Sequence, residues 1–245
     1  MLDFGFYNMD CIEGMKEFPD YYFDLAICDP PYGGVTQGGY MANPHSCDKK
    51  AKNKGYHLSL WSMGKPNKEY FDELKRVSKN QIIWGGNYFT TFLSESQCWI
   101  VWDKENGDND FADCELAWTS FNMASRLFRF RWAGMLQGNM KNKETRIHPT
   151  QKPVALYEWI IGKFANDGDI ILDTHVGSAS SLIACHKTNH KFVGFEIDEE
   201  YYRQAKARLD AELAQKTIFD YTDQIQGQIS IEDLIGGNNV SSNSK

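Results

Sequence analysis

The chain has 245 residues, 42% of them hydrophobic, and a formal net charge of −7, which suits one α/β domain with a sizeable core. No apolar run approaches the ~20 residues that a membrane helix needs, and the N-terminus lacks the basic start and apolar core of a signal peptide. We therefore expect a cytoplasmic protein without a membrane partner.

The charge of the chain is unevenly distributed. Nine lysine and arginine residues stand against four acidic residues between Thr36 and Asn80, and seven stand against one between Met123 and Lys152. Local positive charge of this kind binds phosphates even in a chain that is acidic as a whole. The alternative is a solvated basic surface with no partner.

The six cysteines form no CxxC pair. This spacing indicates neither a zinc site nor a disulfide framework. We expect reduced, mostly buried thiols and no bound metal.

The first half of the chain is expected to contain more strands than helices. An apolar run from Phe23 to Cys28 ends at Asp29-Pro30-Pro31-Tyr32. Further along, two apolar runs flank a turn rich in Gly, Asn and Asp, which predicts an antiparallel hairpin. The expected elements are strands at 4–10, 23–28 and 81–84, a helix at 68–79, and hairpin strands at 98–102 and 114–121.

The second half alternates between helices and strands. A helix is predicted from Pro153 to Phe164, with Leu156, Trp159 and Ile160 on its apolar stripe. Strands are predicted at 170–172 and 191–195, with a glycine turn and a helix between them and a second helix at 199–215. This order is typical of a βαβ unit.

Acidic residues follow four of the expected strands. Because the carboxyl ends of parallel strands meet at one edge of a sheet, we expect Asp10, Asp29, Asp173 and Glu196 to line one crevice. A glycine turn that opens a helix lets the backbone approach a ligand, and Glu196 can accept both hydroxyls of a ribose. The turn DTHVGSAS has one glycine where a dinucleotide fingerprint has three, so we predict a nucleoside site and disfavour a nicotinamide-dependent oxidoreductase. The alternative is a turn in which Gly177 serves only a positive φ angle.

Three short motifs, DPPYGG, HPTQKP and DTHVGSAS, occur in that order and are followed by Glu196. In this order they resemble the β-type amino-methylating DNA methyltransferases, which use S-adenosyl-L-methionine, over roughly Phe6 to Leu209. The resemblance implies a Rossmann-like α/β fold with a seven-stranded, mostly parallel sheet, a circularly permuted motif order and an antiparallel hairpin at one edge. We expect one catalytic domain at 1–216 with basic insertions at about 36–65 and 120–147, then an acidic extension at 217–245 with a disordered end.

The DPPY motif predicts methyl transfer to an exocyclic amine. Asp29 and the carbonyl of Pro30 can accept the two amine hydrogens, Pro31 stiffens the segment, and Tyr32 offers a ring on which a flipped base stacks. This chemistry needs no covalent intermediate, and no cysteine follows a proline, as a cytosine-C5 enzyme would require. Within the resembled family, aspartate at the first position goes mostly with adenine N6. We therefore predict N6-adenine methylation of duplex DNA, with cytosine N4 as the alternative.

The resemblance also implies the residues that bind the cofactor. It places Glu196 on the ribose, Asp10 and Cys28 near the adenine, and Thr150 and Lys152 at the carboxylate. The chain departs from the family pattern at an aromatic, a glycine and a threonine position, which are occupied by His175, Ala179 and Ser180, and we interpret His175 as a packing ring and not a general base. The full set is Asp10, Cys11, Cys28, Asp29, His148, Thr150, Lys152, Asp173, His175, Gly177, Ser178, Ala179, Ser180, Glu196 and Ile197.

The segment available for DNA recognition is short and runs from Ser120 to Ile147. Within it, RLFRFRW has the period of a half-buried strand with outward arginines, which can contact phosphates or guanine edges. The alternative is a solubilising edge strand. Candidate DNA contacts are Lys49, Lys50, Lys52, Lys54, Arg126, Arg129, Arg131, Lys141, Lys143 and Arg146.

The short recognition segment suggests help from a second subunit, so we expect a homodimer, and a cognate restriction endonuclease as a further partner. Two other readings stay open from the sequence. One is a related methyltransferase acting on RNA or on a protein amide, and the other is a non-catalytic DNA-binding relative.

Overall fold

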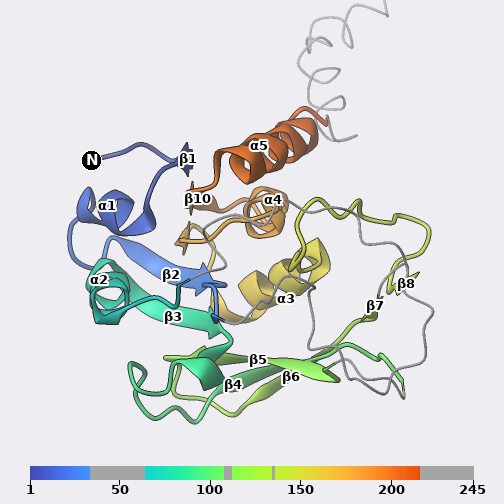
Figure 1. The fold of residues 1–245 in the computed structure, drawn as a ribbon, viewed down its shortest axis with the longest axis horizontal. Coiled ribbons are helices and arrows are strands. Elements are labelled where there is room, and N and C mark those ends of the chain that lie inside the picture. The colour runs from blue at the N-terminus through green and yellow to red at the C-terminus, as the bar shows by residue number, and fades with distance from the viewer. Residues whose placement is uncertain (34–63, 108–111, 134–135, 216–245) are drawn as a thin grey trace, which may run out of the picture. The chain divides into compact units, whose positions relative to one another are not determined.

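Eight strands of the described residues form the main sheet (Figure 1). Their spatial order is β1 (Gly5–Asn8), β10 (Lys191–Glu196), β9 (Ile170–Asp173), β2 (Phe23–Cys28), β3 (Ser78–Trp84), β5 (Cys114–Thr119), β4 (Trp99–Asp103) and β6 (Arg126–Arg129). The computed structural model describes residues 1–33, 64–107, 112–133 and 136–215. Two short strands, β7 (Trp132–Ala133) and β8 (Leu136–Gln137), pair with each other in a second, antiparallel sheet.

The main sheet is parallel except at β5, which confirms the expected α/β class. β5 runs antiparallel to both β3 and β4, whereas all other paired neighbours are parallel. The expected hairpin is therefore present as β4 and β5. It does not lie at the edge, however, because β6 pairs outside it with Ile100 opposite Arg126. The sheet consequently has eight strands where we expected seven: the alternation of RLFRFRW predicts a strand but says nothing about which edge receives it.

Helices cover both faces of the sheet. α1 (Cys11–Lys16) and α2 (Lys68–Val77) lie on one face, and α3 (Val154–Phe164), α4 (Ser180–Lys187) and α5 (Glu199–Leu213) on the other (Figure 1). β2 divides its side chains accordingly, with Leu25 and Ile27 in the core under α3 and α4 and with Ala26 and Cys28 in the core under α1 and α2. A strand buried on both faces reads as a continuous apolar run, which is why residues 25–28 show no polar alternation.

The helix ends follow from local chemistry. The Asp10 carboxylate caps α1 by accepting hydrogen bonds from the backbone N–H groups of Ile12 and Glu13. The first N–H of α3, that of Val154, donates to the Glu144 carboxylate at 3.0 Å. Pro153 is the N-cap of α3 and not its first residue, one position away from the expected start.

The chain divides into two compact units, residues 1–209 and residues 210–245. Of the second unit, only residues 210–215 are described. The expected acidic extension at 217–245, and the basic insertion at 36–65 apart from its last two residues, lie outside the described part of the chain. Among the described helices, none combines the length and apolarity needed to cross a membrane.

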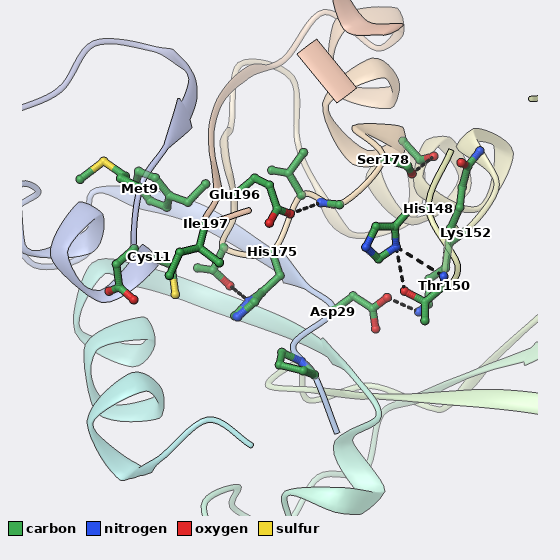
Figure 2. A pocket seen from close by; sticks show the side chains of 18 of the residues that line it. Met9, Cys11, Asp29, His148, Thr150, Lys152, His175, Ser178, Glu196 and Ile197 are labelled. Atoms are coloured by element: carbon green, nitrogen blue, oxygen red, sulfur yellow. Dashed lines mark hydrogen bonds and ion pairs between the residues drawn. The ribbon is translucent and has the colours of Figure 1, made fainter. Parts of the chain in front are cut away.

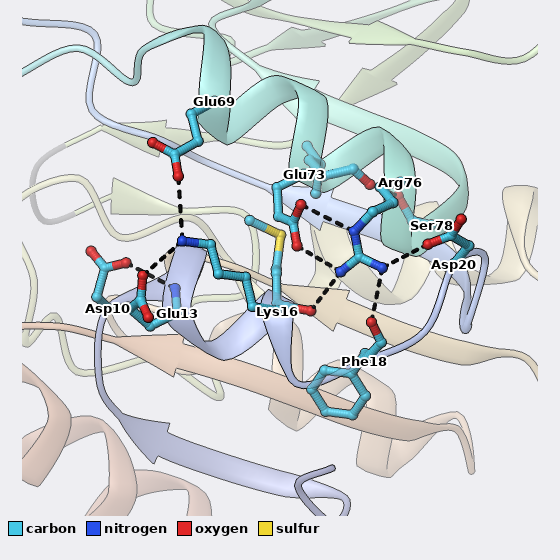
Figure 3. A network of polar contacts seen from close by, with 11 residues as sticks. Asp10, Glu13, Lys16, Phe18, Asp20, Glu69, Glu73, Arg76 and Ser78 are labelled. Carbon is cyan, nitrogen blue, oxygen red and sulfur yellow. Dashed lines mark hydrogen bonds and ion pairs between the residues drawn. The ribbon is translucent and has the colours of Figure 1, made fainter.

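α1 and α2 are joined by the guanidinium group of Arg76 (Figure 3). Arg76 donates two hydrogen bonds to Glu73, one to Asp20, and one each to the carbonyls of Phe18 and Met15. The planar fork of arginine therefore satisfies two carbonyls that end α1 while it is itself neutralised by carboxylates.

We predict that Arg76→Lys lowers the free energy of unfolding by about 2 kcal/mol, because a lysine ammonium cannot reach the carbonyls and both carboxylates together. Urea unfolding of the purified chain measures it. Arg203→Lys is the matched control, since Arg203 pairs with Glu200 on an exposed helix surface and a change there is expected to be within about 0.5 kcal/mol. Equal effects of the two substitutions would contradict the prediction.

Candidate active site

The carboxyl ends of β1, β2, β9 and β10 meet the segment 148–152 around a cavity of about 210 Å³ (Figure 2). Its lining draws on the three motifs DPPYGG, HPTQKP and DTHVGSAS. From the ends of β1 and β2 come Asp10, Cys11, Asp29 and Pro31, and from the segment 148–152 come His148, Thr150 and Lys152. The opposite wall is formed by His175, Gly177, Ser178, Ser180, Glu196 and Ile197.

Some expected site residues lie next to the cavity without lining it. Cys28, Asp173 and Ala179 are buried beneath the wall, with exposures of 0%, 2% and 0%. The crevice is thus lined by Asp10, Asp29 and Glu196 but not by Asp173, which corrects the expectation that all four carboxylates line it. The reason is local: the side chain of the last β9 residue turns under the following loop, as described below.

Glu196 joins the end of β10 to the glycine loop. One carboxylate oxygen accepts the backbone N–H of Gly177 at 2.9 Å and the other accepts that of Asp198 at 2.9 Å. Burial raises the pKa of Glu196, although the two N–H groups oppose that shift. Because a carboxylate has about four lone-pair positions, both oxygens keep the capacity to accept further hydrogen bonds from a ligand in the cavity.

The loop between β9 and α4 contains two left-handed residues, Gly177 with a φ of +56° and Ala179 with a φ of +62°. The positive φ favours glycine at position 177. Lack of space is not the reason, because a Cβ there would lie at an ordinary 3.6 Å from the His148 ring. Ala179 adopts the same region at a cost of about 1 kcal/mol. Arg208 of α5 holds the loop by donating to the Ser178 carbonyl at 2.6 Å and to the Ser180 hydroxyl at 2.9 Å. No sequence signal marks Arg208, since its role depends on how α5 packs.

Asp173 organises the loop from below. Its carboxylate accepts hydrogen bonds from the His175 backbone N–H and the Ser181 hydroxyl. Burial raises the pKa of Asp173 to about 7, against the lowering effect of these two donors. The carboxylate therefore changes charge in the neutral range while it supports the cavity wall.

We predict a pH dependence of stability that belongs to Asp173. Its folded pKa of about 7 lies above the value of the unfolded chain, so its contribution to stability is greatest below pH 4 and is lost as the pH rises through 7. Between pH 5 and 8, the free energy of unfolding of the wild type should fall by about 2 kcal/mol relative to that of Asp173→Asn. Urea unfolding of both chains across this range measures the difference, and parallel pH profiles would contradict it.

The Asp29 carboxylate is held at the cavity by two donors. The Tyr32 hydroxyl donates to Oδ1 at 2.6 Å, and the Lys152 ammonium contacts Oδ2. Lys152 is only 3% exposed and also lies 3.1 Å from Glu115. We expected Lys152 to face a cofactor carboxylate, whereas the structure places its ammonium between two carboxylates of the protein itself (Figure 2 shows the contact with Asp29).

The Tyr32 ring is positioned by the turn after β3. It stacks on Tyr88 with ring centroids 5.0 Å apart and an interplanar angle of 15°. Gly85, with a φ of +66°, lies so close that a Cβ there would be 2.2 Å from the ring. Glycine is thus the residue that lets the ring settle against this turn. Pro30 is buried, and neither Pro30 nor Tyr32 lines the cavity itself.

Both histidines of the site are neutral at physiological pH. Burial lowers the pKa of His148 to about 3, with the charge of Lys152 adding to the effect, and burial lowers the pKa of His175 to about 4. The His175 ring packs against Tyr70 with a centroid distance of 5.3 Å. This environment agrees with the interpretation of His175 as a packing ring.

Tyr157 is a lining residue that the sequence analysis missed. It lies on α3, is 5% exposed, and makes no hydrogen bond through its hydroxyl with any described residue. Burial, with the charges of Asp29 and Asp173, holds its pKa well above the usual value, so the phenol stays a donor. The apolar stripe of the predicted helix did not mark Tyr157 as a site residue, because an apolar ring at that position would pack equally well.

We predict that Tyr157→Phe leaves the free energy of unfolding unchanged within about 0.5 kcal/mol, since no hydrogen bond within the described structure is lost. Loss of a hydrogen bond to a ligand should instead raise the KM of the cofactor by about threefold to tenfold. Steady-state kinetics and urea unfolding of the same preparation separate the two effects. A wild-type KM would show that the hydroxyl does not serve the ligand.

The expected DNA contacts are only partly described. Lys49, Lys50, Lys52 and Lys54 lie outside the described residues. Arg129, Arg131, Lys141 and Lys143 are exposed, and Leu127, Arg129 and Arg131 alternate with the more buried Phe128 and Phe130, as the sequence pattern predicted. Arg126 is partly buried, and Arg146 packs its guanidinium over the Trp132 ring at 4.5 Å. Arg146 therefore has a packing role.

Comparison with known proteins identifies the family. A DNA methylase family model matches residues 100–207. The type II methyltransferase M.HpaI of Haemophilus parainfluenzae is 48% identical over 244 aligned residues, which cover 83% of this chain and 73% of that protein. This chain belongs to the DNA methylase family. S-adenosyl-L-methionine is the cofactor of that family, and the protein is a DNA methyltransferase that uses it.

Solved DNA methyltransferases have the same fold. The M1.HpyAVI–SAM complex superimposes with a TM-score of 0.52 at 22% identity, covering 83% of this chain and 98% of that one. PvuII DNA methyltransferase, described as cytosine-N4-specific, gives a TM-score of 0.56 at 14% identity and covers 90% of each chain. At these identities the similarity shows the shared Rossmann-like methyltransferase fold, which the sequence analysis expected.

Proposed function

We propose that this methyltransferase transfers the methyl group of S-adenosyl-L-methionine to the N6 amine of an adenine flipped out of duplex DNA. The observation that carries the proposal is the position of Asp29, whose carboxylate lines the same cavity as Glu196 and the Gly177 loop. One cavity thus holds acceptors for an exocyclic amine and acceptors for a nucleoside. The order of the motifs, with DPPY before the glycine loop, supports assignment to the permuted β-type.

The residues after β2 would prepare the target amine. Asp29 and the carbonyl of Pro30 accept one amine N–H each, which turns the nitrogen lone pair away from conjugation with the base and toward the cofactor. When bound, S-adenosyl-L-methionine supplies a methyl group activated by its sulfonium. The amine would take up this methyl group, and it would lose a proton to solvent after transfer. Neither neutral histidine needs to act as a base in this sequence.

The chemistry of the cavity wall fits the cofactor. Glu196 keeps free lone-pair positions for the ribose hydroxyls, and Gly177 and Ser178 line the cavity where the methionine part would lie. Asp10 and Cys11, at the start of α1, would border the adenine. Because Lys152 is engaged by Asp29 and Glu115, we assign the cofactor carboxylate to Thr150 alone.

Adenine is proposed as the target because aspartate stands first in the DPPY motif. Cytosine N4 is the second candidate, and the observation in its favour is the shared fold with the cytosine-N4-specific PvuII enzyme. Both amines are planar and conjugated, so the acceptors at Asp29 and Pro30 suit either. The choice between adenine and cytosine would then depend on the size of the base that stacks at the site. We assign this stacking to the Tyr32 ring, which itself rests on Tyr88.

The likeness to a type II methyltransferase favours a place in a restriction-modification system, with a cognate endonuclease as partner and a cytoplasmic location. Duplex DNA would be contacted through the exposed Arg129, Arg131, Lys141 and Lys143. We propose a homodimer because the described recognition segment is short.

We predict that the purified protein produces N6-methyladenine in DNA and that Asp29→Ala lowers turnover by about 10³-fold or more, because the amine loses its anionic acceptor. Nucleoside mass spectrometry of treated DNA measures the product, and modified-base sequencing gives the target site. The melting temperature of Asp29→Ala serves as the control for folding. N4-methylcytosine as the product would replace adenine by cytosine, and wild-type turnover of Asp29→Ala would refute the assigned mechanism.

A further inference from the structure

Behind Asp29, four charged side chains alternate in sign. Lys104 contacts one oxygen of Glu115, the other oxygen of Glu115 lies 3.1 Å from Lys152, and Lys152 contacts Asp29. Two cations and two anions balance, so the chain of contacts carries no net charge. Only Lys152 and Asp29 line the cavity, whereas Lys104 and Glu115 lie outside its wall.

The register of the sheet determines on which face Lys104 and Glu115 lie. Glu115 of β5 stands opposite Trp102 of β4, and Ala117, two residues further on, stands opposite Trp84 of β3. Residues two apart share a face of a sheet, so Lys104, Glu115 and both tryptophans project to the same side. That side is the core beneath α3 and α4, which contains Trp84 and Trp102.

The two tryptophans form an apolar floor under the cations. The Lys152 ammonium lies 5.1 Å above the Trp84 ring and the Lys104 ammonium 5.3 Å above the Trp102 ring. An aromatic face attracts a cation without fixing its position along the ring. The carboxylates therefore decide where the Lys152 ammonium rests.

Glu115 competes with Asp29 for a single buried ammonium. Lys152 is 3% exposed, and it has these two carboxylates as its anionic partners among the described residues. If the charge of Glu115 were removed, the ammonium would interact with Asp29 alone and cover more of the oxygen that the target amine must reach. If Lys104 were removed, Glu115 would attract the ammonium more strongly and draw it away from Asp29.

We propose that Glu115 and Lys104 are positioning residues for methyl transfer, which set the place of the Lys152 ammonium and thereby the orientation of the Asp29 carboxylate toward the target amine. The inference rests on the proposed role of Asp29. Neither residue lines the cavity, so we expect their effect in turnover and not in cofactor binding.

The test uses the full-length protein with labelled S-adenosyl-L-methionine and whole-genome-amplified DNA, which offers every short target site in unmethylated form. Glu115→Gln should lower kcat by about tenfold and leave the KM of the cofactor within about twofold of the wild type, because only the geometry at Asp29 changes. Glu73→Gln is the matched control: Glu73 is a poorly exposed partner of Arg76 on α2, remote from the cavity, and its kcat should equal that of the wild type.

A double substitution tests whether Lys104 affects turnover only through Glu115. Lys104→Met should lower kcat in the wild-type background, because an ammonium drawn toward Glu115 no longer holds the Asp29 carboxylate in its orientation. It should have no further effect in the Glu115→Gln background, since Lys104 acts through Glu115 alone. Additive losses would overturn the proposal. If Glu115→Gln lowers the melting temperature more than Glu73→Gln does, Lys104→Met becomes the deciding variant, and a wild-type kcat for it overturns the proposal.

Three outcomes separate this inference from the proposed function. A wild-type kcat for Glu115→Gln beside an inactive Asp29→Ala overturns the inference and leaves the proposed function intact. Activity of Asp29→Ala overturns both. A raised cofactor KM at unchanged kcat in Glu115→Gln would place Lys152 on the cofactor and also overturn the inference.

Discussion

The buried ammonium of Lys152 is the contact on which the site depends. It joins three parts of the chain that are distant in sequence: the end of β2 through Asp29, the middle of the sheet through Glu115 on β5, and the segment that leads into α3. A lysine with 3% exposure is tolerated only when carboxylates compensate for its lost hydration. Burial lowers the pKa of Lys152, but the charges of Asp29 and Glu115 outweigh that effect and hold its pKa above the usual value. The ammonium is therefore favoured over the neutral amine although it is buried.

The pairing of β2 with β9 brings the DPPY segment and the glycine loop together. Leu25 stands opposite Ile171 and Ala26 opposite Leu172, although these residues are about 146 positions apart in the chain. Since both strands are parallel, Asp29 and the glycine loop emerge at the same edge of the sheet. Asp173 and Glu196 then hold that loop by accepting hydrogen bonds from it. The cavity is thus a consequence of strand order and of hydrogen bonds to two carboxylates.

The sequence analysis was most reliable where a pattern has a local cause. β2, β9, β10 and the helices that follow them appear within a few residues of the predicted bounds, because apolar runs and glycine turns encode them directly. The strand pattern of RLFRFRW was also confirmed as β6, with Arg129 outward. Its place outside β4 was missed, since any free strand edge offers the same backbone groups. Seven expected strands therefore became eight.

By itself, the sequence determined the α/β class, the set of motifs around one cavity, and membership of the DNA methyltransferases, which comparison with M.HpaI confirmed. These follow from local hydrophobic patterns and from short motifs whose chemistry does not depend on distant contacts. Only the tertiary structure decided that Lys152 pairs with Asp29 and Glu115, that Asp173 lies beneath the loop, that Arg208 holds the loop, and that Tyr157 lines the cavity. The physical reason is that each of these contacts depends on which side chains face each other across the sheet or the helix layer. Burial then decides whether a charged group is neutralised by a neighbouring residue or stays available to bind a ligand.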